Sequence, residues 1–215
     1  TDEHGVNIQR VAEEKGKTPQ EYVDYISTEM KAMFAQFGLD EYDIFMRTTK
    51  KFHYEGVQNL WREIAKNKKP KGNSTIYKSN YEAWFCPNCA EFKTETEYEV
   101  RDGEDVPRCL THEKPLDKVA EESYFFRLSD YGDKLLELIE NTELVRPEAR
   151  RNEVVSFIKS GLQDLSISRL RSSVSWGIPV PDDENHVMYV WLDALSNYIT
   201  AIGYGNSERA EIGFE

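Results

Sequence analysis

The sequence predicts an α/β protein that carries a small β-rich subdomain in its middle. Apolar residues recur at helical spacing in the first third of the chain and again towards its end, whereas residues 76–106 form short aromatic runs broken by turn residues. Two pairs of metal-ligating side chains lie in and just after these runs. With 215 residues, the chain is long enough to bury one sizeable core and a smaller satellite.

The first part of the chain predicts two helices that follow an opening loop. Residues 1–5, TDEHG, have the composition of a loop after a strand, so we expect the chain to be cut from something longer. Thr18 and Glu21 form a capping-box pattern with proline at the first helical position, and an apolar stripe follows until Gly38. Residues 50–66 repeat the helical pattern before a loop rich in lysine.

The second half of the chain predicts a mixture of helices and strands. Helical periodicity returns in residues 130–140 and again before Gly161. Residues 174–180 and 187–190 are strand-like, and residues 191–202 predict a closing helix with one apolar face. No internal repeat or low-complexity tract interrupts this order.

Charge and cysteine usage exclude several classes of protein. The formal net charge of −12 at pH 7 excludes a chain-wide positive field that would wrap nucleic acid unaided, although it is compatible with a local nucleic-acid contact. The basic stretches 66–71 and 146–151 are interpreted as solvated loops. No apolar run reaches the roughly 18 residues that span a bilayer, and no secretory signal opens the chain. Because three cysteines cannot all pair, we expect a reducing cytoplasm, with an organellar form left open.

Four residues form a strong zinc-binding pattern. Two residues separate Cys86 from Cys89, and two separate Cys109 from His112. Each short spacing lets a tight turn direct two ligands at one ion, and together they complete a closed tetrahedron of three thiolates and one imidazole. Such an ion would be structural and would contribute on the order of 10 kcal/mol to folding. The alternatives are unpaired core cysteines with a surface histidine, or a catalytic zinc, which would need an open coordination position.

Five short stretches in succession carry a family resemblance. They are TDEHG at residues 1–5, FMRTT at residues 45–49 followed by His53, the four-ligand pattern, ESYFFRLS at residues 122–129, and the succession RNEVVSFIKSGLQDLSISR, SWGIPVP and HVMYVWLDALSNY within residues 151–198. A lone pair of cysteines at this spacing is common. In this order and over nearly the whole chain, however, the stretches resemble methionyl-tRNA synthetases.

The resemblance implies part of a class I synthetase. Its Rossmann-like nucleotide-binding domain, built on a parallel sheet, would be interrupted by an α+β connective-peptide insertion that carries the zinc knuckle. Residues 1–44 would belong to the catalytic nucleotide-binding domain and residues 187–215 to its return. Residues 45–186 would form the insertion, with the knuckle at about residues 76–121.

The resemblance also implies an activity, that of a methionine–tRNA ligase. Such an enzyme forms an adenylate from methionine and ATP, which enters with magnesium, and transfers the methionyl group to tRNA. The His-Ile-Gly-His and Lys-Met-Ser-Lys-Ser motifs that bind ATP in this class are absent from the sequence, so we expect this chain to be inactive alone. No membrane partner is expected, and nothing in the sequence indicates an oligomeric state.

An apolar stripe would form the methionine pocket by resemblance. Its members, spaced as i, i+3, i+4 and i+7 on one helical face, are Trp191, Ala194, Leu195 and Tyr198. The methionine thioether is apolar and polarisable, which suits aromatic contact. On spacing alone, such a stripe is more typical of plain core.

Three other residues are catalytic candidates by resemblance: Asp2, His4 and Arg169. Asp2 and His4 would lie at the edge of the substrate cleft, with roles that the sequence does not specify. Arg169 resembles a family arginine near the ATP phosphates, where forked hydrogen bonds could stabilise negative charge; its alternative is a surface salt bridge. His53 and His186 are interpreted as packing or surface residues, because this chemistry needs positioning more than a general base.

Two other functions compete with this interpretation. The first is a stand-alone zinc-ribbon module that binds nucleic acid or protein, and the second is a class I synthetase for leucine, isoleucine, valine or cysteine. A ribbon that binds nucleic acid would interleave basic and aromatic residues beside its ligands, whereas residues 91–105 are rich in acidic side chains. The acidic composition disfavours the first alternative.

Overall fold

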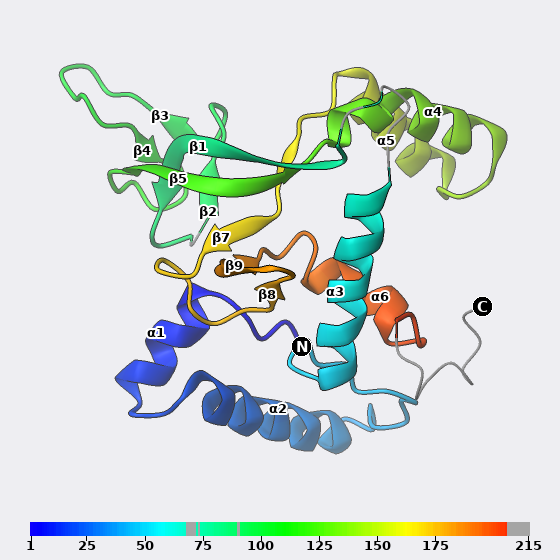
Figure 1. The fold of residues 1–215 in the computed structure, drawn as a ribbon. Coiled ribbons are helices and arrows are strands. Elements are labelled where there is room, and N and C mark those ends of the chain that lie inside the picture. Colours follow the sequence, from blue (N-terminus) through cyan, green and yellow to red (C-terminus); the bar gives the residue numbers. More distant parts are fainter. Residues whose placement is uncertain (68–71, 73, 90, 206–215) are drawn as a thin grey trace.

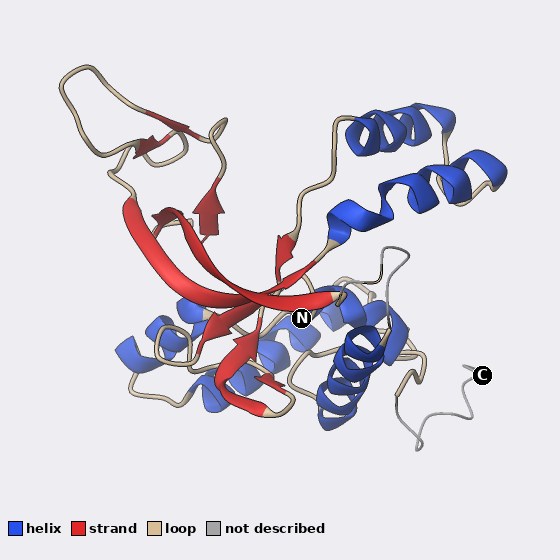
Figure 2. Ribbon diagram, turned by 45° about the horizontal axis from the view of Figure 1, so that its top comes forward, coloured by secondary structure: helices blue, strands red, loops and turns tan. Residues whose placement is uncertain are grey.

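The computed structural model describes residues 1–67, 72, 74–89 and 91–205. Helices and a small sheet form a base, from which a β arm and a helical hairpin rise on opposite sides (Figure 1). Figure 2 shows the two long strands of the β arm curving above the base. Among the described residues, no helix is long and apolar enough to cross a membrane.

The base begins with three helices, α1 (Val6–Glu14), α2 (Pro19–Gln36) and α3 (Lys51–Lys66). The predicted capping box is confirmed, because the Thr18 hydroxyl accepts from the backbone N–H of Glu21 while the Glu21 carboxylate accepts from the backbone N–H of Thr18. Helix α1 was not predicted. It starts after Gly5, whose φ of 114° is strained for residues with a side chain.

The β arm is an antiparallel sheet with the strand order β2-β1-β5-β6. Its long strands pair from Ile76 opposite Phe126 to Phe85 opposite Asp117. The tip carries a two-stranded ladder of β3 and β4. The bounds are β1 Ile76–Cys86, β2 Glu91–Lys93, β3 Tyr98–Glu99, β4 Arg108–Cys109, β5 Asp117–Phe126 and β6 Leu165–Ser166. The strand-rich character predicted for residues 76–106 is therefore confirmed, and the second long strand, β5, extends to Phe126.

The helical hairpin consists of the 3₁₀ turn η1 (Leu128–Tyr131), α4 (Gly132–Asn141) and α5 (Glu148–Lys159), as the helical periodicity predicted. Arg151 donates to the carbonyl of Ile139, which joins the two helices. Arg150 forms an exposed ion pair with Glu153, but the loop predicted for residues 146–151 is wrong from Glu148 onwards, because α5 begins there. Part of the other basic stretch, residues 68–71, lies outside the described residues.

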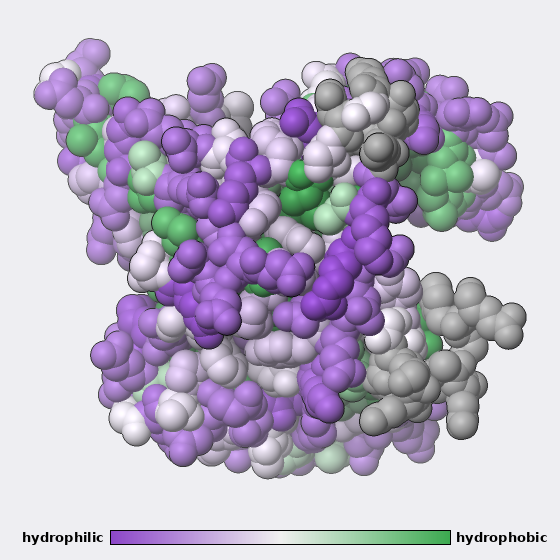
Figure 3. All heavy atoms as spheres, viewed as in Figure 1, coloured by the Kyte–Doolittle hydropathy of each residue, from purple (hydrophilic) through white to green (hydrophobic). Residues whose placement is uncertain are grey.

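The surface of the helical hairpin is partly apolar. Figure 3 shows apolar side chains there, where Leu138, Leu144 and Phe157 are exposed.

A second sheet lies in the base, with the strand order β7-β9-β8. Its strands are β7 (Ser168–Leu170), β8 (Pro179–Val180) and β9 (Asp183–Met188), and both pairings are antiparallel. The strand predicted for residues 174–180 is wrong except at its last two residues, and the next strand ends at Met188. All strand pairs among the described residues are antiparallel, so the parallel sheet that the resemblance implies is not found there.

The closing helix predicted for residues 191–202 is wrong for most of its length. Turns lead into the 3₁₀ turn η2 (Ala194–Ser196) and the single-turn helix α6 (Asn197–Thr200). The Ser196 hydroxyl donates to the carbonyl of Leu192 at 2.5 Å, and the Asn197 amide donates to the carbonyl of Ala194. Such local hydrogen bonds from side chains to the backbone compete with a regular helix.

Two hydrophobic clusters stabilise the described structure. The larger cluster joins α3 to the base sheet and to the start of β1, with Val57, Trp61, Ile76, Ile167, Ile178, Val180 and Met188 as its buried members. The smaller cluster consists of Cys86, Cys109 and Leu116. The partly buried side chains of Trp84, Cys89 and Tyr98 pack against this smaller cluster.

Candidate active site and metal centre

The tip of the β arm brings the four predicted metal ligands together. One ligand atom from each of Cys86, Cys89, Cys109 and His112 lies within 4.8 Å of the others. The Cys89 and Cys109 sulfurs are 3.7 Å apart, and Nδ1 of His112 lies 3.2 Å from Cys89 Sγ and 3.8 Å from Cys109 Sγ. A tetrahedral zinc ion with Zn–S bonds of about 2.3 Å separates neighbouring sulfurs by about 3.8 Å. The donor set and its spacing therefore fit zinc.

The surroundings of the cluster act differently on its thiols. Cys86 ends β1, and the backbone N–H of Cys89 donates to its sulfur at 3.4 Å. Burial opposes ionisation of Cys109, but hydrogen bonds from His112 and from the backbone of Thr111 outweigh it and lower the pKa of Cys109 to about 6. Burial and the neighbouring sulfurs raise the pKa of Cys89 to about 11. A zinc ion would displace the proton that Cys89 retains.

Below the metal centre, a pocket of about 380 Å³ lies between the β arm and the base. The arm contributes Cys89 and Phe92 to its wall. The base contributes all three catalytic candidates, Asp2, His4 and Arg169. The structure thus brings together residues from the opening loop and from β7, which are more than 160 positions apart in the sequence.

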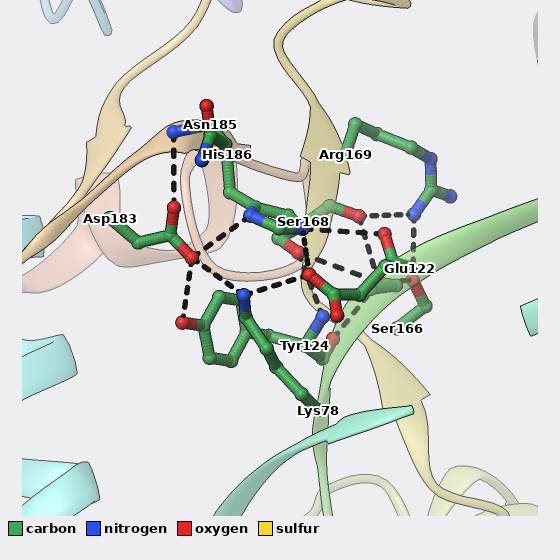
Figure 4. A network of polar contacts seen from close by, with 10 residues as sticks. Lys78, Glu122, Tyr124, Ser166, Ser168, Arg169, Asp183, Asn185 and His186 are labelled. Atoms are coloured by element: carbon green, nitrogen blue, oxygen red, sulfur yellow. Dashed lines mark hydrogen bonds and ion pairs between the residues drawn. The ribbon is translucent and has the colours of Figure 1, made fainter. Parts of the chain in front are cut away.

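Arg169 is buried in the wall of this pocket, with 6% of its surface exposed. Its guanidinium lies 3.6 Å from the ring centre of Tyr189 and 4.7 Å from that of Phe92. Figure 4 shows Nη1 donating to the Ser166 hydroxyl at 2.6 Å and to the carbonyl of Ser168 at 2.7 Å. Its acidic neighbour, Glu121, is 3.9 Å away and also buried. A surface salt bridge is therefore the wrong description of Arg169.

Asp193 is a buried carboxylate that the sequence analysis did not select. It is 2% exposed and lies 2.6 Å from Nδ1 of His4 and 3.0 Å from Nε2 of His53. The other nitrogen of His4 contacts the Tyr54 hydroxyl at 2.8 Å, and that of His53 contacts the Thr200 hydroxyl at 2.7 Å. Nothing local in the sequence marked Asp193, because its partners come from distant segments.

His53 and His186 are both fully buried, which agrees with a packing role. His186 lies 3.1 Å from the carboxylate of Asp183, which also accepts from Lys78 at 2.8 Å and from the Tyr124 hydroxyl at 2.9 Å (Figure 4). These contacts join β1 and β5 of the arm to β9 of the base. The arm is thereby fixed to the sheet beside the pocket.

The apolar stripe lies outside this pocket, on the surface. Exposed fractions are 50% for Trp191, 55% for Leu195 and 73% for Tyr198, and Ala194 is half-buried. The opposite side of the segment is buried and polar, because Asp193, Ser196 and Thr200 point inwards. Among the described residues, the stripe is therefore a surface feature and not part of the core, unlike the plain core that its spacing suggested. An exposed apolar set of this kind is typical of a surface that binds something.

Comparisons with known proteins agree with these observations. The family model of tRNA synthetases class I (M) matches residues 1–215. The chain is 48% identical over 205 residues to the methionine–tRNA ligase of Caldanaerobacter subterraneus, which covers 95% of this chain and 30% of that protein. It is 46% identical over 219 residues to the methionine–tRNA ligase of Streptomyces coelicolor, covering 100% of this chain and 39% of that protein.

A solved structure extends the similarity to three dimensions. Mycobacterium tuberculosis methionyl-tRNA synthetase bound by methionyl-adenylate matches with a TM-score of 0.81 and 37% identity, over 97% of this chain and 39% of that one. The chain spans about a third of the length of the curated relatives it matches, from 30% to 39%. A match over the whole chain disfavours a stand-alone zinc ribbon and supports the α/β fold of a class I synthetase domain. The chain therefore belongs to the methionyl-tRNA synthetase family of class I tRNA synthetases.

Proposed function

We propose that the protein carrying this chain is a cytoplasmic methionine–tRNA ligase, which activates methionine with ATP and magnesium and transfers it to tRNA. The observation that carries the proposal is the meeting of Asp2, His4 and Arg169 in one pocket of a chain that is similar throughout to such enzymes. A relative solved with methionyl-adenylate supports methionine and ATP as the substrates.

The chemistry of the pocket suits an aminoacyl adenylate. The Arg169 guanidinium would bind negative charge that develops on phosphate oxygens, and its contacts with Ser166, Ser168 and Tyr189 hold it in place before the substrate arrives. Asp2 is exposed on the pocket wall, where its carboxylate would suit an ammonium group. The stripe of Trp191, Ala194, Leu195 and Tyr198 lies outside the pocket, but Val190 and Asp193 of the same segment line it, so the stripe would take the methionine thioether at the edge of the pocket.

We also propose that a structural zinc ion is held by Cys86, Cys89, Cys109 and His112. All four donors are engaged in a closed set, so the ion would supply rigidity to the arm and leave no position for substrate. Because Cys89 also lines the pocket, a stable tip would keep that wall in place. The zinc knuckle would lie in an insertion of residues 45–186, flanked by catalytic-domain residues 1–44 and 187–215.

Methionine-dependent ATP–pyrophosphate exchange by the complete gene product tests the proposed function. Exchange should depend on methionine and should be far weaker with leucine, isoleucine, valine or cysteine. Arg169→Met should lower kcat on the order of 100-fold, because one preorganised charge on the reacting phosphate is lost. Arg171→Met is the matched control, since Arg171 is exposed and its rate should stay within about twofold of the parent rate. Exchange that is insensitive to Arg169→Met would contradict the assignment of this pocket.

A further inference from the structure

Three segments that are far apart in the sequence meet at the carboxylate of Asp193. His4 belongs to the loop before α1, His53 to α3, and Asp193 to the turn that follows β9. The His4 and His53 side chains are 5% and 0% exposed, so both hydrogen bonds to Asp193 are shielded from water. A shielded contact of this kind holds its partners more firmly than an exposed one does.

The hydrogen-bond chemistry assigns a proton to each ring. A carboxylate has only acceptors, so His4 must present Nδ1–H and His53 must present Nε2–H to Asp193. Burial opposes ionisation of Asp193, but the hydrogen bonds from the two histidines outweigh it and hold its pKa below the ordinary value. Burial also raises the pKa of Tyr54 to about 12, so its phenol keeps the proton that it can donate to Nε2 of His4.

The same contacts reach the pocket through the opening loop. Asp2 lies two residues before His4 in this loop, and both residues line the pocket. The His4 ring also packs against Trp176, with ring centres 5.4 Å apart. Asp193 itself lies between Trp191 and Ala194 in the sequence, so its position also sets the position of the exposed stripe.

We propose that Asp193 is a positioning residue that holds the Asp2 carboxylate and the apolar stripe in one relative geometry, by anchoring His4 and His53 together. Asp193 itself lines the pocket, and in this proposal it acts through the ring of His4 that it holds. The inference rests on the proposed function, because it takes Asp2 and the stripe as parts of the amino-acid site. In this proposal, His4 orients the opening loop that carries Asp2, and its imidazole transfers no proton.

Kinetics of the complete gene product test the positioning role. Asp193→Asn keeps the shape of the side chain but replaces one acceptor by a donor, so it can satisfy only one of the two histidine N–H groups. We expect the methionine KM in pyrophosphate exchange to rise about tenfold while the ATP KM stays within about twofold. His4→Ala should have a similar effect, and the double variant should be no worse than the stronger single variant, because both act through one contact.

Thr200→Val is the matched control, because it removes the hydroxyl that contacts the far side of His53. It should lower Tm and leave the methionine KM within about twofold, since it does not touch His4. The inference is overturned if Asp193→Asn lowers Tm with a normal methionine KM. It is also overturned if Thr200→Val raises that KM as much as Asp193→Asn does.

A measurement on the 215-residue chain separates this inference from the proposed function. Nitrogen-15 NMR of labelled histidine at pH 8 should find the proton on Nδ1 of His4 and on Nε2 of His53, and one of the two should change in Asp193→Asn. The same tautomer on both rings would overturn the anchor whatever the activity. If the tautomers are as expected but the gene product shows no methionine-dependent exchange, the proposed function fails and the substrate side of this inference fails with it.

Discussion

Arg47 donates from Nε to the carboxylate of Glu3 at 2.7 Å, and both side chains are buried. Arg47 also donates to Asp24 at 2.6 Å, while the Thr49 hydroxyl donates to Glu3. Because Glu3 precedes His4, this pair is a second anchor for the loop that carries Asp2. Residues 45–49, FMRTT, therefore hold the opening loop in place through Glu3, although none of them lines the pocket.

Replacing Arg47 by methionine should destabilise the protein by about 3–5 kcal/mol, since it leaves Glu3 as an uncompensated buried charge. Urea denaturation measures the free energy of unfolding. Arg10→Met is the matched control: Arg10 pairs with Glu14 on the surface, and its loss should cost about 1 kcal/mol or less. Similar small losses in both variants would contradict the view that the buried pair anchors the loop.

Glu3 also predicts how stability depends on pH. Burial opposes its ionisation, but hydrogen bonds from Arg47, Thr1 and Thr49 outweigh burial and hold the pKa of Glu3 below its ordinary value of 4.5. A carboxyl group with a lowered folded pKa contributes stability that is fully present above the unfolded pKa and is lost as the pH falls through the folded pKa. Between pH 6 and pH 3, the parent protein should therefore lose more unfolding free energy than Glu3→Gln. Parallel curves for the two proteins would show that Glu3 is not the responsible group.

The metal centre predicts one zinc per chain. Cys109→Ala should bring the zinc content close to zero, because it removes one of four ligands and the most acidic of the thiols described above. Metal analysis after dialysis measures the content. Thr111→Ala, which lies between two ligands without being one, should keep its zinc. Unchanged zinc in Cys109→Ala, or none in the parent protein, would refute the assignment.

Substitutions in the exposed stripe should weaken methionine binding without destabilising the fold. In the complete gene product, Trp191→Ala and Tyr198→Ala should raise the methionine KM tenfold or more and leave the ATP KM nearly unchanged, since methionine loses its aromatic walls. Because both side chains are at least half exposed in the 215-residue chain, the Tm of that chain should change little. Trp61→Ala is the contrasting control, because Trp61 is 5% exposed and its loss should cost about 3–5 kcal/mol. A normal methionine KM in the stripe variants would rule out the pocket.

The sequence predicted best those features whose residues lie close together in the chain. Thr18 and Glu21 are three positions apart, and each metal-ligand pair spans one tight turn, so short spacing alone indicated the helix start and the metal cluster. Arg169, Asp2 and His4 came from family resemblance, and only the folded chain shows that they share a pocket.

What the sequence did not predict depends on distant contacts. Asp193 lies 140 positions from His53 and 189 from His4, so no periodicity could identify it as their common acceptor. The spacing of the stripe suggested a regular helix, but the inward side of that segment is polar. Side-chain hydrogen bonds from Ser196 and Asn197 to the backbone compete with the helix, and turns form in its place.

The 215-residue chain alone should not catalyse methionine-dependent pyrophosphate exchange, because its sequence lacks the two motifs that hold ATP in this class. Its exchange rate should equal that of a boiled sample, whereas the complete gene product serves as the positive control. A rate well above the boiled sample would mean that the pocket binds ATP without those motifs.

Transfer of labelled methionine to tRNA by the complete gene product tests the central claim most directly. The account predicts that methionine is attached to tRNA in an ATP-dependent reaction, and that Arg169→Met reduces the rate of attachment far more than Arg171→Met does. Attachment of leucine, isoleucine, valine or cysteine in preference to methionine, or no attachment of any amino acid, would contradict it.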